Sequence, residues 1–156
     1  MSSLWLAWKE EVIAQYGAQK QMADAALAKV DDECFFARLT ESGDDHTNSL
    51  AILVKHLSGN FNSRWTDFLT TDGEKATRQL PREFLHEASD NRAAIMAHWE
   101  EGWRCLFATL DALTEEDFAK TVYIRGEAHS MVKAILRNLL HATHHIGQID
   151  LLAGAL

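Results

Sequence analysis

Residues that end a helix are rare in this chain. Its 156 residues contain one proline, Pro81, and eight glycines, so long stretches pass without a helix breaker. Apolar side chains recur in these stretches at the three- and four-residue spacing of an amphipathic helix. These two features predict an all-α protein. A chain of this length buries roughly 68–70% of its unfolded surface in one core, so we expect a single domain over residues 1–156.

Four segments are long enough to form the main helices of such a domain. We expect these helices, with polar connectors of unequal length between them, at about residues 3–30, 48–71, 89–110 and 130–154. Asn48 and Ser130 are the expected N-caps of the second and fourth helices. Four long helices joined in this way predict an antiparallel four-helix bundle.

Shorter elements are expected in the connectors. The acidic pair at the start of residues 31–36 predicts a helical turn, and Thr114 precedes a second short turn. Residues 122–124 are predicted to be briefly extended, whereas residues 40–47 and 74–85 are predicted to be loops. The core is therefore expected to come from the four long helices. Leu4 belongs to the apolar stripe of the first helix. The residues expected to face inward from the third and fourth helices are Ile95, Trp99, Trp103, Leu106 and Leu110, and Val132, Ile135, Leu136, Leu139 and Ile146.

The charge balance is acidic and argues against some partners. Lys and Arg number 15 against 23 Asp and Glu, for a formal net charge of −8, so we expect no nucleic-acid partner. Cys34 and Cys105 form no CxxC pair and are predicted to be reduced, mostly buried thiols. No signal peptide and no apolar segment of roughly 20 residues is evident, so we expect a cytoplasmic protein without a membrane partner.

Three of the eight histidines lie within five residues near the end of the chain. His141 and His145 are four residues apart, so on a helix they share a face one turn apart. At this spacing two imidazoles can bind one metal ion. His144 is three residues from His141 and lies further round the helix, which makes His145 the better second ligand. A pair makes a poor metal site, so a third ligand must come from elsewhere.

His56 is the candidate third ligand. It lies off the apolar arc of the second helix, on a polar stripe with Asn60 and Asp67, and His141 and His145 lie on a similar stripe of the last helix. Two interpretations stay open. Either the stripes are solvent-exposed faces, or they face each other and gather three imidazoles around a metal with open positions. Zinc suits such a set, and nickel, iron and manganese also bind it.

Several other polar residues are candidates for contact with a substrate or with the ligand histidines. They are Asn60, Arg64, Asp67, His129 and Gln148. The alternative for each is exposure to solvent or helix capping. The remaining histidines have no partner at ligand spacing and are expected to be structural or exposed: His46, His86 and His98.

Two separated motifs carry a family resemblance. One is Asn48-Ser49 followed, after six residues, by His56-Leu57; the other is His141-x-x-x-His145-Ile146-Gly147-Gln148-Ile149. In this order they resemble the signature of the DinB/YfiT-like superfamily. The similarity extends through residues 63–75 and 124–130, which resemble a subfamily of small uncharacterised bacterial proteins, and it covers most of residues 1–153.

The resemblance implies an up-down-down-up four-helix bundle, often a homodimer, that binds a divalent metal ion through three histidines. By motif position the ligands are His56, His141 and His145. Better-understood members are metal-dependent thiol transferases and a thiol-dependent isomerase that use bacillithiol, mycothiol or glutathione. The superfamily name refers to damage-inducible expression, a stress response.

These observations lead to two functional hypotheses. The first is a metal-dependent enzyme of thiol transferase or hydrolase type that acts on a small electrophile, with zinc or nickel favoured over iron or manganese. The second is a bundle that binds a metal or ligand without catalysis, because no general base or nucleophile is evident. Five tryptophans, including Trp5 and Trp8, favour a homodimer, unless all five are enclosed within one chain.

Overall fold

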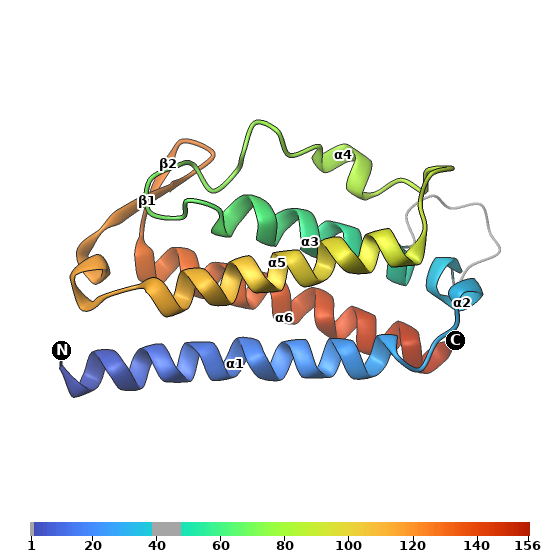
Figure 1. Ribbon diagram of the computed structural model, residues 1–156, viewed down its shortest axis with the longest axis horizontal. Coiled ribbons are helices and arrows are strands. Elements are labelled where there is room, and N and C mark those ends of the chain that lie inside the picture. Colours follow the sequence, from blue (N-terminus) through green and yellow to red (C-terminus); the bar gives the residue numbers. More distant parts are fainter. Residues whose placement is uncertain (1, 39–47) are drawn as a thin grey trace.

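A computed structural model of the protein describes residues 2–38 and 48–156, so the connector predicted at 40–47 and His46 lie outside the described residues (Figure 1). Within these ranges the protein is mostly helical. The elements in chain order are α1 (Ser3–Leu27), α2 (Asp32–Phe36), α3 (Leu50–Trp65), α4 (Leu80–Glu83), α5 (Arg92–Ala112), the 3-10 turn η1 (Glu115–Ala119), β1 (Thr121–Ile124), β2 (Glu127–Ser130) and α6 (Met131–Ala155).

The four long helices lie side by side (Figure 1). α1 and α6 run in one direction, and α3 and α5 run in the opposite direction. α3 packs against α5 and α6, and α1 packs against α6 and α5. Because α3 and α5 are parallel, the chain between them must return along the molecule. This crossover, residues 66–91, contains α4, which packs on α3.

The helix ends follow local capping. The side chains of Ser2, Ser49, Asn91 and Ser130 accept hydrogen bonds from backbone amides in the first turns of α1, α3, α5 and α6. The prediction of Ser130 is confirmed, whereas Ser49 replaces the predicted cap Asn48.

α3 is shorter than the sequence predicts. It ends at Trp65 rather than at residue 71, because Thr66 adopts an extended backbone and Asp67 follows with a left-handed one, at a φ of 48°. The amides of Thr70 and Thr71 then bond to the Asp67 carbonyl in a turn. The crossover predicted as a loop contains α4, with Pro81 in its first turn. Amides in the first turn have no acceptor within the helix, so proline loses no backbone hydrogen bond there.

The aromatic core lies largely between α3, α5 and α1. The side chains predicted to face inward from α5 are all buried: Ile95, Trp99, Trp103, Leu106 and Leu110. Trp5 and Trp65 are also buried, and Trp8 is partly buried against the core. The tryptophans are therefore mainly accommodated within one chain.

The buried face of α6 differs from the predicted apolar arc. Leu136, expected to face inward, is 44% exposed, while Ala134, Asn138 and Ala142 are buried. The rest of the predicted arc does face the core: Ile135 and Ile146 are fully buried, and Val132 and Leu139 are partly buried against it. The buried face therefore extends from this arc toward small side chains and away from Leu136. Leu4 of α1, another expected core residue, is 79% exposed.

A hairpin precedes α6. β1 confirms the extended segment predicted at 122–124, and β2, which was not predicted, pairs with it in antiparallel register. Arg125 and Gly126 connect the strands with φ values of 55° and 76°, as a two-residue hairpin turn requires. Asp72 of the crossover accepts hydrogen bonds from both of their amides, at 2.8 and 2.7 Å. The crossover is thereby attached to the hairpin.

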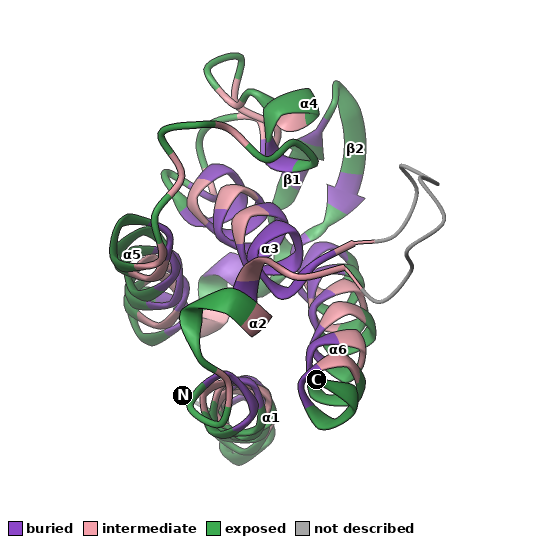
Figure 2. Cartoon of the chain, turned by 90° about the vertical axis from the view of Figure 1, so that its right-hand side faces the viewer, coloured by how far each residue is buried: buried purple, intermediate pink, exposed green. Residues whose placement is uncertain are grey.

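α3 is buried along most of its length (Figure 2). α4 and the hairpin lie over the side of α3 that the other long helices leave open. The polar stripe around His56 is therefore covered by protein instead of facing solvent, and His56 and Asn60 are only 8% and 7% exposed.

Cys34 and Cys105 are unpaired, as predicted, but both are partly exposed rather than mostly buried. Among the helices of the described residues, none is long and apolar enough to cross a bilayer.

Candidate metal centre

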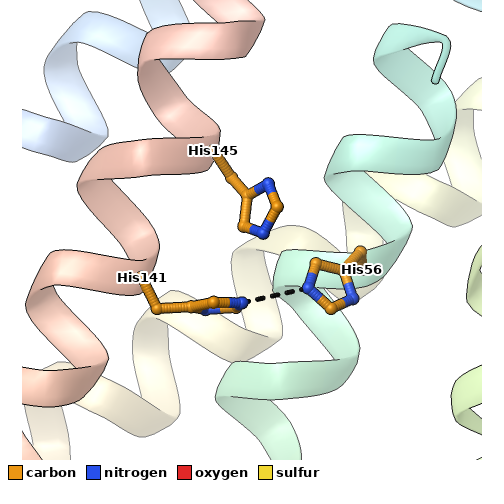
Figure 3. Close-up of side chains that lie close together, drawn as sticks. All are labelled: His56, His141 and His145. Atoms are coloured by element: carbon orange, nitrogen blue, oxygen red, sulfur yellow. Dashed lines mark hydrogen bonds between the residues drawn. The ribbon is translucent and has the colours of Figure 1, made fainter. Parts of the chain in front are cut away.

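His56 of α3 and His141 and His145 of α6 point toward one another (Figure 3). The ring nitrogens that they offer all lie within 4.8 Å of one another. His56 Nε2 lies 3.1 Å from His141 Nε2, and the His145 ring centroid lies 4.6 Å from that of His141. Tetrahedral zinc, with bonds of about 2.0–2.1 Å, holds its ligand nitrogens roughly 3.3 Å apart. The three histidines are thus close to the spacing that a bound ion requires.

The structure separates the two histidines that competed in the sequence. His145 faces His56, with ring centroids 4.8 Å apart. His144 is exposed and contacts only the outer side of the cluster, through the His145 ring at 5.1 Å. The i, i+4 pair therefore faces α3, and the two polar stripes meet as the second interpretation required.

Glu83 orients His56. Its Oε2 atom lies 3.0 Å from His56 Nδ1, and Arg78 donates to both carboxylate oxygens at 2.7 Å. Burial favours the neutral carboxyl, but the hydrogen bonds from Arg78 and His56 outweigh it and lower the pKa of Glu83. An ionised Glu83 accepts the Nδ1 proton of His56. The Nε2 lone pair of His56 is then directed at the other histidines.

Gly59 permits this contact. A Cβ atom at residue 59 would collide with Glu83 Oε1 and would lie 2.7 Å from the carboxyl carbon. Glycine inside a helix costs about 1 kcal/mol relative to alanine, so close approach explains its presence in α3. Phe84, the residue after Glu83, lies against the His56 ring with centroids 4.8 Å apart.

Burial favours the neutral form of His141 and His145, the two histidines of α6 that face α3. Burial, with smaller effects from the other two histidines, Arg78 and Arg64, lowers the pKa of His141 to about 3. Burial also lowers the pKa of His145, although a hydrogen bond from its Nδ1 to Gln148 Oε1 at 2.7 Å opposes the shift. His141 Nδ1 is buried and has no hydrogen-bond partner within the described part of the chain. Neutral imidazoles have the free lone pairs that a metal ion needs.

A cavity of about 290 Å³ opens beside this cluster. His56 and His141 form part of its wall, together with residues from the crossover, the hairpin and α6. A larger groove of about 780 Å³ lies between α3, α5 and the crossover, and its lining does not include the three histidines. We take the smaller cavity as the space beside the site because it is the one that the histidines line.

The other candidate residues divide into two groups. Asn60 and Arg64 line the cavity, and Gln148 contacts His145. Asp67 does not join them, because α3 ends before it and the helical stripe cannot be extended that far. His129 of β2 is buried and does not line the cavity, and neither ring nitrogen has a hydrogen-bond partner among the described residues. The Glu127 carboxylate, 3.9 Å from His129 Nε2, is too distant for one.

Four residues of the site were missed in the sequence: Arg78, Glu83, Arg125 and Arg137. Arg137 precedes His141 by four residues, so helical spacing alone could have placed it beside the site. Glu83 and Arg78 belong to the crossover, whose pattern has no helical period. No sequence signal places them against α3.

The remaining histidines do not join the cluster. His86 lies at a hydrogen-bonding distance of 3.1 Å from Ser49 Oγ, and His98 lines the larger groove. The prediction that they have no part in the three-histidine set agrees with these positions.

The fold and site together define a helical protein with a three-histidine cluster, partly buried, that could hold a metal ion. The chain matches the family model described as "Protein of unknown function (DUF1572)" over residues 3–156, and it belongs to that family. Neither a curated protein nor a solved structure matches the chain. The family description names no reaction.

Proposed function

We propose that this protein binds one divalent metal ion through His56, His141 and His145 and is a metal-dependent thiol transferase or hydrolase. The observation that carries the proposal is the convergence of three imidazoles, with ring nitrogens within 4.8 Å, at the wall of a cavity. The set contains no fourth protein ligand among the described residues, which leaves coordination positions for a substrate.

We also propose that the fold is an up-down-down-up four-helix bundle of the DinB/YfiT-like superfamily. The motifs around His56 and His141 support this relationship, as do the opposed directions of the α1/α6 and α3/α5 pairs. Better-understood members of that superfamily use a low-molecular-weight thiol, and we propose such a thiol as a partner of this protein.

The residues around the cluster have separable roles in this proposal. A bound metal ion would supply Lewis acidity, lowering the pKa of a thiol or water. Glu83 holds the proton on His56 Nδ1, and Gln148 accepts the proton of His145 Nδ1, so both Nε2 atoms are directed inward. Phe84 covers one side of the His56 ring and limits access of water. Three imidazoles suit zinc or nickel best, with iron or manganese as alternatives.

A non-catalytic metal- or ligand-binding role is the second candidate. Both carboxylates near the cluster are already engaged in hydrogen bonds, which favours this role. Glu83 bonds to Arg78 and His56, and Glu74 accepts a hydrogen bond from Arg78 at 3.3 Å. Neither carboxylate is free to act as a general base. A protein that senses or sequesters a metal would need no such base.

Metal analysis of the purified protein tests the site. We expect about one equivalent of zinc or nickel in the wild type grown with both metals, and less than a tenth of that in a His56→Ala/His141→Ala variant. His144→Ala is the matched control, because His144 is exposed outside the cluster, and it should keep the wild-type content. A wild type without metal, or equal loss in the control, would contradict the proposal.

The two functional candidates are separated by an activity assay on the metal-loaded protein. Glutathione or bacillithiol is incubated with a reactive electrophile, and conjugation is followed over time. A saturable rate that disappears in the His56→Ala/His141→Ala variant supports the enzyme. If the protein binds metal stoichiometrically but neither conjugates the electrophile to a thiol nor hydrolyses it, the result supports the binding role.

We propose a homodimer whose interface includes exposed leucines of α6 rather than the tryptophans. Four of the five tryptophans are buried within the chain, so they no longer favour a dimer. Leu140 and Leu151 on the outer face of α6 are 71% and 74% exposed, and an interface would cover them. Sedimentation at micromolar concentration should give a dimer that a Leu140→Glu/Leu151→Glu variant abolishes. A wild-type monomer rejects the proposal.

A further inference from the structure

The cavity beside the histidines has a positive wall in an acidic protein. The chain has a formal net charge of −8, yet the cavity is lined by four arginines, Arg64, Arg78, Arg125 and Arg137, and one carboxylate, Glu74. Both crossover and hairpin contribute to this lining, as do α3 and α6. The concentration of positive charge therefore arises from the tertiary fold and not from a basic segment.

Only part of this charge is neutralised by the protein. Arg78 pairs with Glu74 and Glu83, and Arg125 lies 3.6 Å from Glu74. No carboxylate of the described residues lies within ion-pair distance of Arg64 or Arg137. Arg64 is 6% exposed, and a buried charge without a counterion is costly. Within the described part of the chain, the cavity thus contains two cations without an ion-pair partner, and Glu74 is the one carboxylate in its lining.

Arg64 is held with its terminal amino groups available. Its Nε atom donates to the Gly73 carbonyl at 3.3 Å, and no acceptor within the described ranges binds its Nη atoms. A Cβ at Gly73 would lie 2.7 and 2.8 Å from Nε and Cδ of Arg64, so the glycine makes room for this conformation. Burial lowers the pKa of Arg64, and the charge of Arg137 lowers it further. The two guanidinium groups are close enough to repel, which a bound anion would relieve.

Asn60 adds a neutral donor through a hydrogen-bond chain. The Trp65 indole, which can only donate, bonds to Asn138 Oδ1 at 3.3 Å, and the Tyr16 hydroxyl donates to the same oxygen at 3.0 Å. Asn138 Nδ2 therefore faces Asn60 and donates to its Oδ1 at 2.7 Å. This leaves Asn60 Nδ2, on a residue that lines the cavity, without an acceptor in the described structure.

We propose that this cavity binds the carboxylate of a small organic ligand through Arg64, Arg137 and the Asn60 amide, beside the histidine cluster. Guanidinium groups match a carboxylate with two parallel hydrogen bonds. Phosphate is the other oxyanion with this chemistry, but its sites commonly use backbone amides at the start of a long helix. Arg64 and Arg137 instead lie within α3 and α6. A cavity of about 290 Å³ suits a small ligand.

The inference assigns a substrate class to the proposed function and rests on it for the ligand's role as substrate. Binding by the arginines, however, needs no metal. The test therefore uses protein freed of metal with a chelator. Carboxylate binding can then be measured even if the three histidines bind no metal ion. Succinate, succinamate and succinamide are titrated by calorimetry, because they share a carbon frame and differ in carboxylate number.

We expect succinate and succinamate to bind and succinamide to bind at least tenfold more weakly. Arg64→Gln and Arg137→Gln should each weaken succinate binding roughly ten- to hundredfold, since each removes charge-assisted hydrogen bonds. Arg64→Lys should fall between Arg64→Gln and the wild type. Arg104→Gln is the control, because Arg104 is exposed and pairs with Glu101 on α5, away from the cavity.

Arg137 is exposed, so its variant should fold even if the change at buried Arg64 disturbs the protein. Equal binding of succinate and succinamide, or unchanged binding in Arg137→Gln, overturns the proposal. Inorganic phosphate is titrated in parallel. Phosphate binding that depends on Arg64 and Arg137, without succinate binding, overturns the assignment to a carboxylate.

Discussion

The two sides of α3 bury their residues by different means. Toward α5 and α1, Phe61 and Trp65 pack among aromatic rings, with Phe61 and Trp103 centroids 4.7 Å apart. Toward α6 and the crossover, His56 and Asn60 are buried as well, but each has a polar partner, Glu83 or Asn138. The first side stabilises the fold through apolar burial, whose free energy is roughly proportional to the buried area and does not depend on direction. The second depends on individual hydrogen bonds, because an unpaired buried polar group is costly.

Stability and chemistry therefore reside on different sides of α3. Removing an aromatic side chain from the first side should destabilise the whole protein without a specific effect on ligands. Changing one polar contact on the second side should alter metal or proton binding more than it alters folding.

Trp103→Ala should give the largest loss of stability. Trp103 is 1% exposed and contacts Phe61, Trp99 and Phe107. Its removal should lower the free energy of unfolding by about 3–5 kcal/mol, measured by denaturant titration of the metal-free protein. Trp8→Ala, at a partly buried position, should cost less. A loss below that of Trp8→Ala would mean that the aromatic side is not the main source of stability.

Gly59→Ala should separate folding from metal binding. The added Cβ displaces Glu83 from His56, so metal affinity should fall roughly 10–100-fold, as for other losses of a carboxylate behind a ligand histidine. Helix propensity alone favours alanine by about 1 kcal/mol. Gly147→Ala on α6 is the control, since a Cβ there meets nothing within 4 Å. Competition with a chromophoric chelator measures the affinity, and equal values for both variants would contradict the role of Glu83.

The pH dependence of folding should reflect the polar side. The pKa of His141 is about 3 in the folded protein against an ordinary 6.5, so the unfolded chain binds the extra proton between these values. The free energy of unfolding of the metal-free protein should therefore fall as the pH is lowered from about 6.5 toward 3. The lowered pKa of Glu83 acts in the same direction at the acidic end.

A His141→Gln variant should flatten the upper part of this pH dependence, whereas Trp103→Ala should shift the curve down without changing its slope. Urea titrations at several pH values measure both. An unchanged slope in His141→Gln would show that another group controls acid unfolding.

Much of the local structure was predictable. Ser130 was expected to cap α6, and the inward residues of α5 were predicted correctly, because periodicity and capping act within one helix. The sequence does not predict the end of α3, because the left-handed residue there is Asp67 and not the glycine that usually marks such a turn. β2 was missed because its four residues carry no clear alternation of apolar side chains.

The candidate site was only partly predictable for the same reason. Helical spacing places His141 and His145 on one face of α6, and Arg137 with them. It cannot show which helix that face will meet. The resemblance of the motif at His56 supplied that pairing, and the structure brings the three rings together.

The helices, most of their caps and the angular positions of the histidines follow from the local sequence, since these depend on residues within a few turns of one another. The covering of the polar side of α3 does not follow from the sequence, because the crossover that covers it has no regular period. Asp72 attaches the crossover to the hairpin, and Gly59 lets Glu83 reach α3. These long-range contacts turn a polar helix face into a covered site with oriented histidines, beside which Arg64 and Arg137 have no ion-pair partner among the residues that the structure describes.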